Sequence, residues 1–263
     1  MSSIPRFDEM QRRILASLGT LFLVGACSSD TSSVAPSPTS GSSTTRAPIR
    51  VLMLTATAGF RHDSIATARQ VMTNLAASTG EFAVTATEAL SSISASTLSG
   101  TDVLDFTLTS GELPFTSDQK AAIVTFVSGG GGFLGVHSAT DTLYEWPDYG
   151  RLIGAYLKEH PWTQRASVLV EDQSHPATDG LGARFSLLEE FYTFRENPRP
   201  HVHVLLRLDA TSIGSDGDYP LAWTRSFGNG RVYYNALGHF PETWNDQRFQ
   251  RQLTGAIRWA ARR

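Results

Sequence analysis

The sequence predicts an α/β fold, a three-layer sandwich around a mainly parallel sheet with antiparallel additions. Short continuous apolar runs, typical of strands buried on both faces, recur between residues 50 and 136. Segments with apolar residues at helical spacing separate these runs, as they do in βαβ units. After residue 165, strand-like segments follow one another across short, turn-rich stretches, which suits antiparallel strands.

The first half of the folded region alternates strands with helices. Helical periodicity begins at Ser64, with Asp63 or Ser64 as the expected cap. A second helix begins near Ser117 and ends at the glycines of 129–132. Strands are expected at 50–55, 82–87, 102–108 and 133–136.

The second half is expected to extend the sheet. A closing helix at 247–261 places Phe249, Leu253 and Ile257 near one side. The strands expected before it are 166–171, 185–194, 202–208, 221–227 and 231–235.

The N-terminal residues 1–26 are typical of an export signal. Two arginines precede an apolar core at 14–26, which is too short to span a bilayer. Small residues then lead directly to Cys27, and this arrangement resembles the lipobox of bacterial lipoproteins, in which the cysteine is lipidated. An ordinary secreted protein cleaved after Gly25-Ala26 is the alternative.

A tether is predicted at 27–48, where Ser, Thr, Pro, Gly and Ala dominate and too little apolar surface is available to fold. The domain is then 49–263. Cys27 is the only cysteine, so this domain has no disulfide, cysteine nucleophile or thiolate metal ligand. We expect an exported protein of the cell membrane, attached through its lipid anchor alone.

The charge balance argues against nucleic acid as a partner. Lys and Arg total 22 and Asp and Glu total 25, giving a formal net charge of −3. No basic block with interleaved aromatic residues is present.

Three of the seven histidines follow predicted strands. His62 lies in the loop after the first strand, His137 directly follows 133–136, and His239 follows 231–235. The carboxyl ends of parallel strands share one edge of a sheet, so we expect these imidazoles to converge. Imidazole suits both general acid/base catalysis and metal binding.

Carboxylates near these histidines would fix the tautomers of the imidazoles and raise their basicity. Asp141, Glu190 and Glu242 are the candidates. The residues leave open whether the histidines act as acids and bases without a metal or bind a divalent cation, for which His137 and His239 are the candidate ligands.

The remaining histidines have structural explanations. His160 and His175 each precede a proline and suit turns, whereas His201 and His203 suit the polar face of a strand. The glycines at 129–132 form no phosphate loop, because no Gly-Lys-Ser/Thr follows them. Several aromatic residues near the candidate loops suit either sugar stacking or the core: Trp146, Tyr149, Tyr156, Trp162, Tyr192 and Trp244.

Five motifs stand in order along 49–263. They are Gly59-Phe60-Arg61-His62-Asp63, Gly132-Phe133-Leu134-Gly135-Val136-His137-Ser138-Ala139-Thr140-Asp141, His175-Pro176-Ala177-Thr178, Glu190-Phe191-Tyr192 and Gly230-Arg231-Val232-Tyr233-Tyr234-Asn235-Ala236-Leu237-Gly238-His239. Together they resemble the trehalose-utilisation (ThuA-like) family. The resemblance implies the flavodoxin-like α/β sandwich of the class I glutamine amidotransferases.

The resemblance also implies a changed reaction. The amidotransferases carry a cysteine nucleophile where Gly135-Val136-His137 places a histidine, and imidazole cannot form the glutamyl thioester. Glutamine hydrolysis is therefore excluded. One departure from the family pattern is Tyr219, which stands where members usually carry a histidine before Pro220.

The resemblance implies a role in catabolism of trehalose or related disaccharides, acting on 3-keto sugars as an isomerase, lyase or hydrolase. His137 and His239 would act as acid/base groups or metal ligands, with His62, Asp141 and Glu190 orienting them. The substrate-binding candidates are Arg61, Ser138, His160, Trp162, Tyr192 and Glu242.

Two other functions remain compatible with the sequence. One is a sugar-binding lipoprotein without catalysis, which would use the aromatic residues. The other is a metal-dependent hydrolase of a different small polar substrate.

Overall fold

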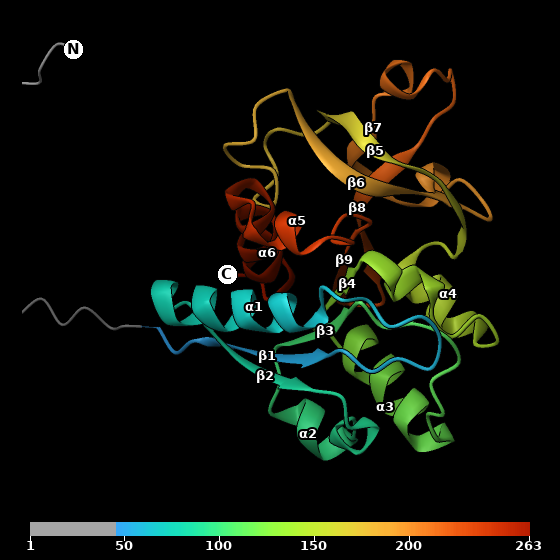
Figure 1. Ribbon diagram of the computed structural model, residues 1–263. Coiled ribbons are helices and arrows are strands. Elements are labelled where there is room, and N and C mark those ends of the chain that lie inside the picture. Colours follow the sequence, from blue (N-terminus) through green and yellow to red (C-terminus); the bar gives the residue numbers. More distant parts are fainter. Residues whose placement is uncertain (1–45) are drawn as a thin grey trace, which may run out of the picture. The chain divides into compact units, whose positions relative to one another are not determined.

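The structure, a computed structural model, describes residues 46–263 (Figure 1). The predicted export signal, the lipidation site Cys27 and nearly all of the predicted tether lie outside these residues. Within 46–263, no helix combines the length and the apolar character needed to cross a membrane.

One nine-stranded sheet organises the described chain, in the order β2-β1-β3-β4-β9-β8-β7-β5-β6. The first five strands in this order run parallel, and the other four are antiparallel to their neighbours. The parallel strands are β1 (Ile49–Leu54), β2 (Phe82–Thr87), β3 (Val103–Thr107), β4 (Gly132–Val136) and β9 (Gly230–Asn235). The antiparallel strands are β5 (Leu157–Val170), β6 (Arg184–Phe194), β7 (His203–Leu208) and β8 (Pro220–Phe227).

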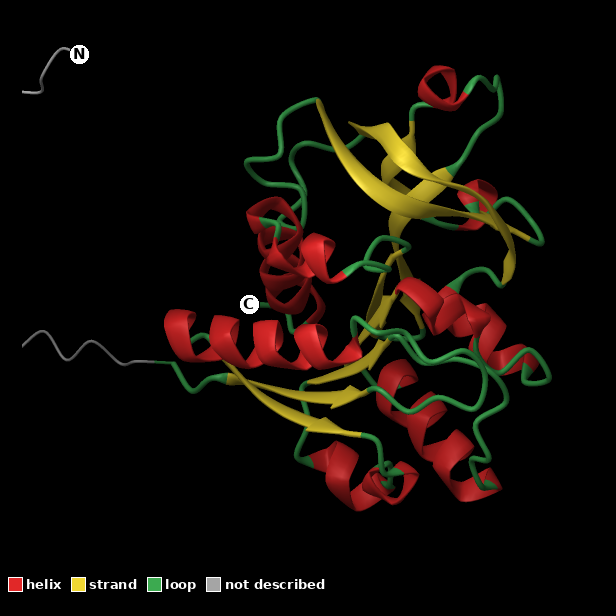
Figure 2. Cartoon of the chain, in the orientation of Figure 1, coloured by secondary structure: helices red, strands yellow, loops and turns green. Residues whose placement is uncertain are grey.

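Helices cover both faces of the parallel part and complete three layers (Figure 2). On one face, α1 (Ile65–Thr79) contacts α5 (Pro241–Asn245) and α6 (Gln247–Ala260). On the other face, α2 (Ala95–Ser99) contacts α3 (Ser117–Ser128), and α4 (Pro147–Ile153) packs against β9. The predicted fold class is confirmed.

The core lies where the parallel strands are buried on both faces. All five residues of β3 and all five of β4 are buried, which explains why their sequences are nearly continuous apolar runs. Close packing fixes Gly135 in β4, because a Cβ there would lie 2.9 Å from Ile153 Cδ1 of α4.

The structure corrects four local predictions. Ser64 lies at the N-cap of α1, but its side chain makes no capping hydrogen bond. Strand β5 begins at Leu157 rather than 166, so His160 lies in a strand and not in a turn. His201 lies in a single 3-10 turn, Arg199–His201, rather than in a strand. The short helices α2, α4 and α5 were not predicted, because five to seven residues are too few for a clear helical period.

Candidate functional site

His137 occupies a strained position directly after β4. Its φ is 53°, in the left-handed region that residues other than glycine rarely adopt. The chain turns there from the strand into a 3-10 helix, His137–Asp141. Tyr234 Oη donates to the His137 carbonyl at 2.8 Å, and the ring Nδ1 donates to the Ala236 carbonyl at 2.7 Å. These contacts hold a strained backbone in place, a feature that concentrates at functional sites.

His62 lies in a loop that is hydrogen-bonded to a neighbouring loop. Ser110 accepts hydrogen bonds through its carbonyl from the amides of Ala58 and Gly59, and its hydroxyl donates to the Phe60 carbonyl at 2.6 Å. Gly59 allows this close approach, since a Cβ there would lie 3.2 Å from the Gly111 nitrogen. The loop buries His62 and leaves Phe60 64% exposed beside it.

His239 is positioned by a buried carboxylate, Glu189 of β6. Glu189 accepts hydrogen bonds from the amides of Gly238 and His239, both at 3.0 Å, and from the Thr243 hydroxyl at 2.6 Å. The hydroxyl of Ser64 donates to the Gly238 carbonyl at 3.2 Å, which ties this loop to the start of α1. Burial raises the pKa of Glu189, although its hydrogen bonds favour the ionised form.

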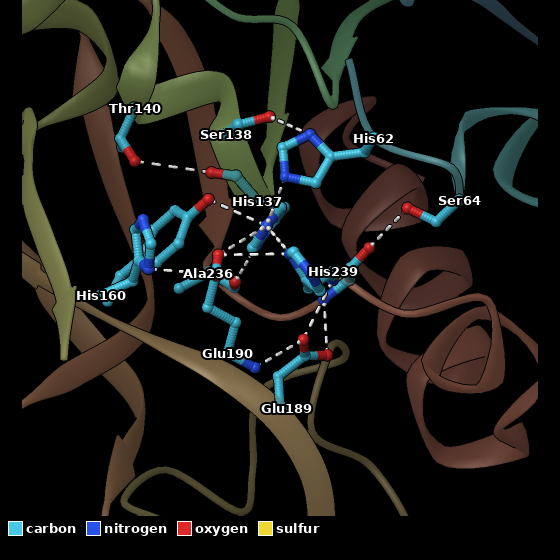
Figure 3. Close-up of polar contacts among 12 residues, drawn as sticks. His62, Ser64, His137, Ser138, Thr140, His160, Glu189, Glu190, Ala236 and His239 are labelled. Carbon is cyan, nitrogen blue, oxygen red and sulfur yellow. Dashed lines mark hydrogen bonds and ion pairs between the residues drawn. The ribbon is translucent and has the colours of Figure 1, made fainter. Parts of the chain in front are cut away.

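The three histidines and Glu190 meet at one point (Figure 3). One ligand atom from each of the four lies within 4.8 Å of the other three. His137 Nε2 is 3.1 Å from His62 Nε2 and 3.3 Å from His239 Nδ1. Glu190 Oε2 is 3.2 Å from His239 Nδ1 and 3.7 Å from His137 Nε2. We call this set, His62, His137, Glu190 and His239, the histidine cluster.

The protonation of His137 directs a lone pair toward the centre of the histidine cluster. His137 donates through Nδ1 to the Ala236 carbonyl, so its Nε2 carries a lone pair when the ring is neutral. Burial, with the nearby His62, lowers the pKa of His137 well below its ordinary value. Burial, with the nearby His239, likewise lowers the pKa of His62 to about 4. Two neutral imidazoles therefore face each other through Nε2.

The protonation of His239 and Glu190 differs from that of His62 and His137. Burial lowers the pKa of His239, but its hydrogen bond to Glu190 and the charge of that carboxylate outweigh burial and raise the pKa overall. Burial raises the pKa of Glu190, yet its hydrogen bond to His239 and the surrounding imidazoles lower it overall. Together these two residues favour a charged pair.

Glu190 reaches the histidine cluster although three strands separate β6 from β9 in the sheet order. The long β5–β6 hairpin curves over the edge of the parallel part (Figure 1), and its register shifts at Glu159 and again before Trp162. This hairpin also supplies Tyr192, whose hydroxyl lies 2.8 Å from His137 Nε2. His160 lies there as well, with its Nδ1 3.1 Å from Glu190 Oε1.

The donor set fits a divalent transition metal. A tetrahedral site with metal–nitrogen bonds of about 2.0–2.1 Å has neighbouring ligands about 3.3 Å apart. Three of the four distances given above, 3.1, 3.3 and 3.2 Å, lie close to that value. Three imidazoles and one carboxylate also form a ligand set suited to such metals, and the Ala236 carbonyl behind His137 orients that ring as partners of metal-binding histidines commonly do.

In addition to Tyr192 and His160, two further predicted site residues lie near the histidine cluster. Ser138 Oγ lies 3.5 Å from His62 Nδ1. Asp141 is half-buried and accepts from the Tyr144 hydroxyl at 2.8 Å. Burial raises the pKa of Asp141.

Three other predicted site residues lie apart from the histidine cluster. The Arg61 guanidinium pairs with Glu88 at 2.9 Å and is half exposed. Trp162 packs edge-on against Tyr219. Glu242 is exposed in the first turn of α5, and it makes no hydrogen bond or ion pair with the cluster among the described residues.

The aromatic residues considered for sugar stacking belong mostly to the core. Tyr149 and Trp244 are completely buried, and Trp146 and Tyr192 are nearly so. The exposed aromatic ring at the histidine cluster is instead Phe60, whose centroid lies 4.8 Å from that of His62.

Sequence reasoning missed Phe60 and Glu189. Phe60 stands directly within the Gly-Phe-Arg-His motif, so its place beside His62 was the available signal. Glu189 precedes Glu190, and because side chains alternate along a strand the two point in different directions. That second carboxylate supports the loop of His239.

Comparison with known proteins agrees with this architecture. A family model described as trehalose utilisation (ThuA) matches residues 50–260. The chain belongs to the ThuA family. No curated protein matches the sequence.

Solved structures resemble the chain over most of its length. A ThuA-like protein from Bacteroides uniformis shares 25% identity with a TM-score of 0.69, covering 82% of this chain and 92% of that protein. A ThuA-like protein from Parabacteroides merdae shares 19% identity with a TM-score of 0.68, covering 81% and 90%. A β-galactosidase from Bacillus circulans shares 14% identity with a TM-score of 0.54, covering 80% of this chain and 31% of that enzyme. The last two similarities concern the fold alone.

The departure at Tyr219 leaves the histidine cluster intact. The Tyr219 hydroxyl hydrogen-bonds Ser215 Oγ at 2.7 Å, and its ring packs against Trp162. Within residues 46–263, the Tyr219 hydroxyl makes no hydrogen bond to the four cluster residues.

Proposed function

We propose that this ThuA family member is a metal-dependent enzyme of disaccharide catabolism whose substrate is a 3-keto sugar. The observation that carries the proposal is the histidine cluster, in which three imidazole nitrogens and one carboxylate oxygen lie within 4.8 Å of one another. His137 Nε2 has a single lone pair but four polar neighbours, Tyr192 Oη included. A cation at the centre would take the place of the proton on His239 Nδ1 and accept the lone pairs of the four ligand atoms.

His62, His137, His239 and Glu190 would hold the metal. When bound, a divalent metal supplies positive charge that polarises a ketone oxygen and acidifies the neighbouring C–H. The buried rings of His62 and His137 exclude water from one side of the site. Tyr192, whose pKa is raised well above its ordinary value by burial, stays protonated and remains a hydrogen-bond donor.

His160 is the proposed base. Its Nδ1 lies 3.1 Å from Glu190 Oε1, and donation from Nδ1 to this carboxylate leaves Nε2 with the lone pair. The side chain is 54% exposed, so a substrate can reach it from solvent. A carboxylate that fixes the tautomer of a histidine base is the arrangement found in catalytic triads.

The proposed reaction begins with proton transfer from the carbon beside the ketone to His160 Nε2. The electron pair of that C–H bond forms a new C=C bond while the bond to the glycosidic oxygen breaks. The departing oxygen takes a proton from solvent or from protonated His160, so charge and atoms balance. Return of the proton to a different carbon would instead give an isomer.

Phe60 is placed to stack against a sugar ring of the substrate. It is one of two large apolar side chains strongly exposed among the described residues, and it lies at the rim of the histidine cluster. Aromatic faces bury the apolar face of a sugar ring at small entropic cost. Phe240, whose ring centroid is 4.6 Å from that of His239, stands on the same rim.

Metal analysis tests the proposal first. Protein produced without a chelator or a histidine tag should contain about one equivalent of a divalent transition metal. His239→Ala should lose this metal, whereas His203→Ala, which removes an exposed histidine paired with Asp172 at 2.8 Å, should retain it. Equal metal content in both variants would refute the metal site.

Turnover is the second test. Wild-type protein should convert a 3-keto disaccharide, and His160→Ala should reduce kcat while metal content stays unchanged. Binding of the sugar with no conversion by wild-type, metal-loaded protein would favour the sugar-binding alternative.

We also propose that the protein is exported and anchored through a lipid on Cys27. The support is the short apolar core followed by small residues and a cysteine. Cys27→Ser should move the protein from the membrane fraction to the soluble extracytoplasmic fraction. Membrane association of the variant equal to that of wild type would contradict this proposal.

A further inference from the structure

A hollow of about 610 Å³ lies beside α4, away from the histidine cluster. The end of α4, the segment that joins it to β5, the end of β6 and strand β8 form its walls. None of the four residues of the histidine cluster lines it. Its volume lies within the range of about 300–1,000 Å³ typical of small-molecule sites.

The hollow carries more positive than negative charge. Arg151, Arg195 and Arg225 line it together with a single carboxylate, that of Glu196. Arg151 pairs with Asp148. Within residues 46–263, neither Arg195 nor Arg225 forms an ion pair. These two arginines therefore leave positive charge available to a ligand.

Arg225 is the least satisfied of these groups. Its Nε is buried without a hydrogen-bond partner among the described residues. Buried polar atoms nearly always have partners, so this donor is open to a ligand atom or a water molecule. Burial also lowers the pKa of Arg225, as expected for a cation with no counter-charge.

The walls are formed before any ligand arrives. Gly154 has a φ of +104°, and a Cβ there would lie 2.9 Å from Trp223 Nε1, which itself donates to the Ile153 carbonyl. A Cβ at Gly150 would lie 2.5 Å from the Tyr156 ring. Side chains at these two glycines would collide with the walls, so both positions need glycine.

Arg195 is held at the rim by stacking. Its guanidinium carbon lies 4.0 Å from the centroid of the Tyr144 ring and 5.9 Å from that of Tyr156. Stacking uses the flat face of a guanidinium and leaves its N–H groups, which point outward in the plane, free to donate.

We propose that this hollow binds a small organic anion through Arg195 and Arg225. Guanidinium groups pair with carboxylate or phosphate oxygens through two parallel hydrogen bonds. Tyr156, Pro147 and Ala155 provide apolar surface for the carbon skeleton of the ligand. The shared chemistry is an oxyanion on a small carbon framework, which sugar acids and sugar phosphates both supply.

Titration calorimetry of the full chain tests this inference. The probes are glucuronate, glucose 6-phosphate, inorganic phosphate and uncharged glucose. We expect one of the two organic anions to bind more tightly than inorganic phosphate, and glucose to show no binding that depends on these arginines. The preferred anion identifies carboxylate or phosphate as the natural group.

Four variants locate the binding site. Arg225→Gln and Arg195→Gln should each weaken anion binding by at least about tenfold, as expected for charge-assisted hydrogen bonds. Arg165→Gln, which removes an exposed arginine of β5 outside the hollow, should leave it unchanged. Arg195→Lys keeps the charge but loses the paired geometry, and it should lie between wild type and Arg195→Gln.

Two results would overturn the inference. One is equal weakening by Arg165→Gln, which would mean non-specific attraction. The other is absence of organic-anion binding by wild-type protein whose thermal unfolding is cooperative. His239→Ala should bind the anion as wild type does, so failure of the metal proposal and failure of this inference are distinguishable.

Discussion

The parallel and antiparallel parts of the sheet contribute differently to the site. The parallel part provides His62, His137 and His239 from loops that follow strands β1, β4 and β9. The antiparallel part provides Glu190 from within a strand, where β6 curves over the edge. A mostly buried scaffold therefore places the imidazoles, and a twisted hairpin adds the carboxylate that pairs with His239.

The two parts also differ in how they are buried. Strand β4 is buried along its whole length, whereas β5 has a run of exposed residues before its buried end. An exposed run permits His160 to face solvent while it remains next to Glu190. The comparison suggests that metal binding depends mainly on the parallel part and proton transfer mainly on the hairpin.

The largest expected effect comes from the parallel part. His137→Ala should abolish metal binding and lower kcat by about 10²-fold or more, because the ring lies at the centre of the histidine cluster. Metal content and turnover of the folded variant measure this, with circular dichroism as the check on folding. A folded variant that retained one equivalent of metal would contradict the dependence of metal binding on the parallel part of the sheet.

Glu190→Gln tests the contribution of the β5–β6 hairpin to the site. The amide removes the charge that pairs with His239 and orients His160, so we expect lower metal affinity and a lower kcat together. Competition with a chromogenic chelator gives the first quantity and steady-state kinetics the second. Glu159→Gln, an exposed glutamate of β5, is the matched control and should change neither.

Glu189→Gln distinguishes a residue that positions His239 from a residue that binds the metal directly. Glu189 accepts four hydrogen bonds, so the amide should leave a buried donor unpaired and cost about 1–3 kcal/mol in the free energy of unfolding. Metal affinity should fall by about 10–100-fold, as when a partner behind a ligand is lost. The exposed neighbour of this loop provides the control, Glu242→Gln. Identical metal affinities for the two variants would contradict the positioning role.

Phe60→Ala should raise KM for a 3-keto disaccharide by roughly 2–10-fold and leave kcat nearly unchanged, the effect expected of an aromatic surface worth about 0.5–1.5 kcal/mol. Phe60→Trp should restore KM. The control is Leu188→Ala, which removes the other large exposed apolar side chain. A fall in kcat with constant KM would place Phe60 outside substrate binding.

A further prediction concerns the pH dependence of folding. Burial lowers the pKa of His62 and of His175 to about 4. Between about pH 4 and pH 6.5 the unfolded chain binds protons that the folded chain does not, so the stability of metal-free protein should rise with pH over this window. His239, whose pKa is raised, opposes this trend in part.

Thermal unfolding at several pH values measures this dependence. His175→Gln should flatten the slope by removing the contribution outside the histidine cluster. A melting temperature that increases on acidification from pH 6.5 to pH 4 would contradict the expectation.

The sequence by itself determined the features that depend on local pattern. Continuous apolar runs predicted the buried strands, and the rule that parallel strands share a carboxyl edge predicted that His62, His137 and His239 would meet. The glycines at 129–132 predicted the end of α3, and the apolar run at 133–136 predicted β4 directly before His137. Each of the strand and helix patterns is contained within a short stretch of consecutive residues.

Tertiary structure alone decided which other groups join the histidines. The sequence named Glu190 and His160 as candidates, but their arrival at the site depends on a bulged hairpin that curves over the sheet, and the sum of small twists over many residues leaves no local pattern. The same holds for Glu189 as the support of His239 and for Arg61 turning to Glu88. Contacts between distant strands depend on the packing of the whole domain, which is why they became visible only in the folded chain.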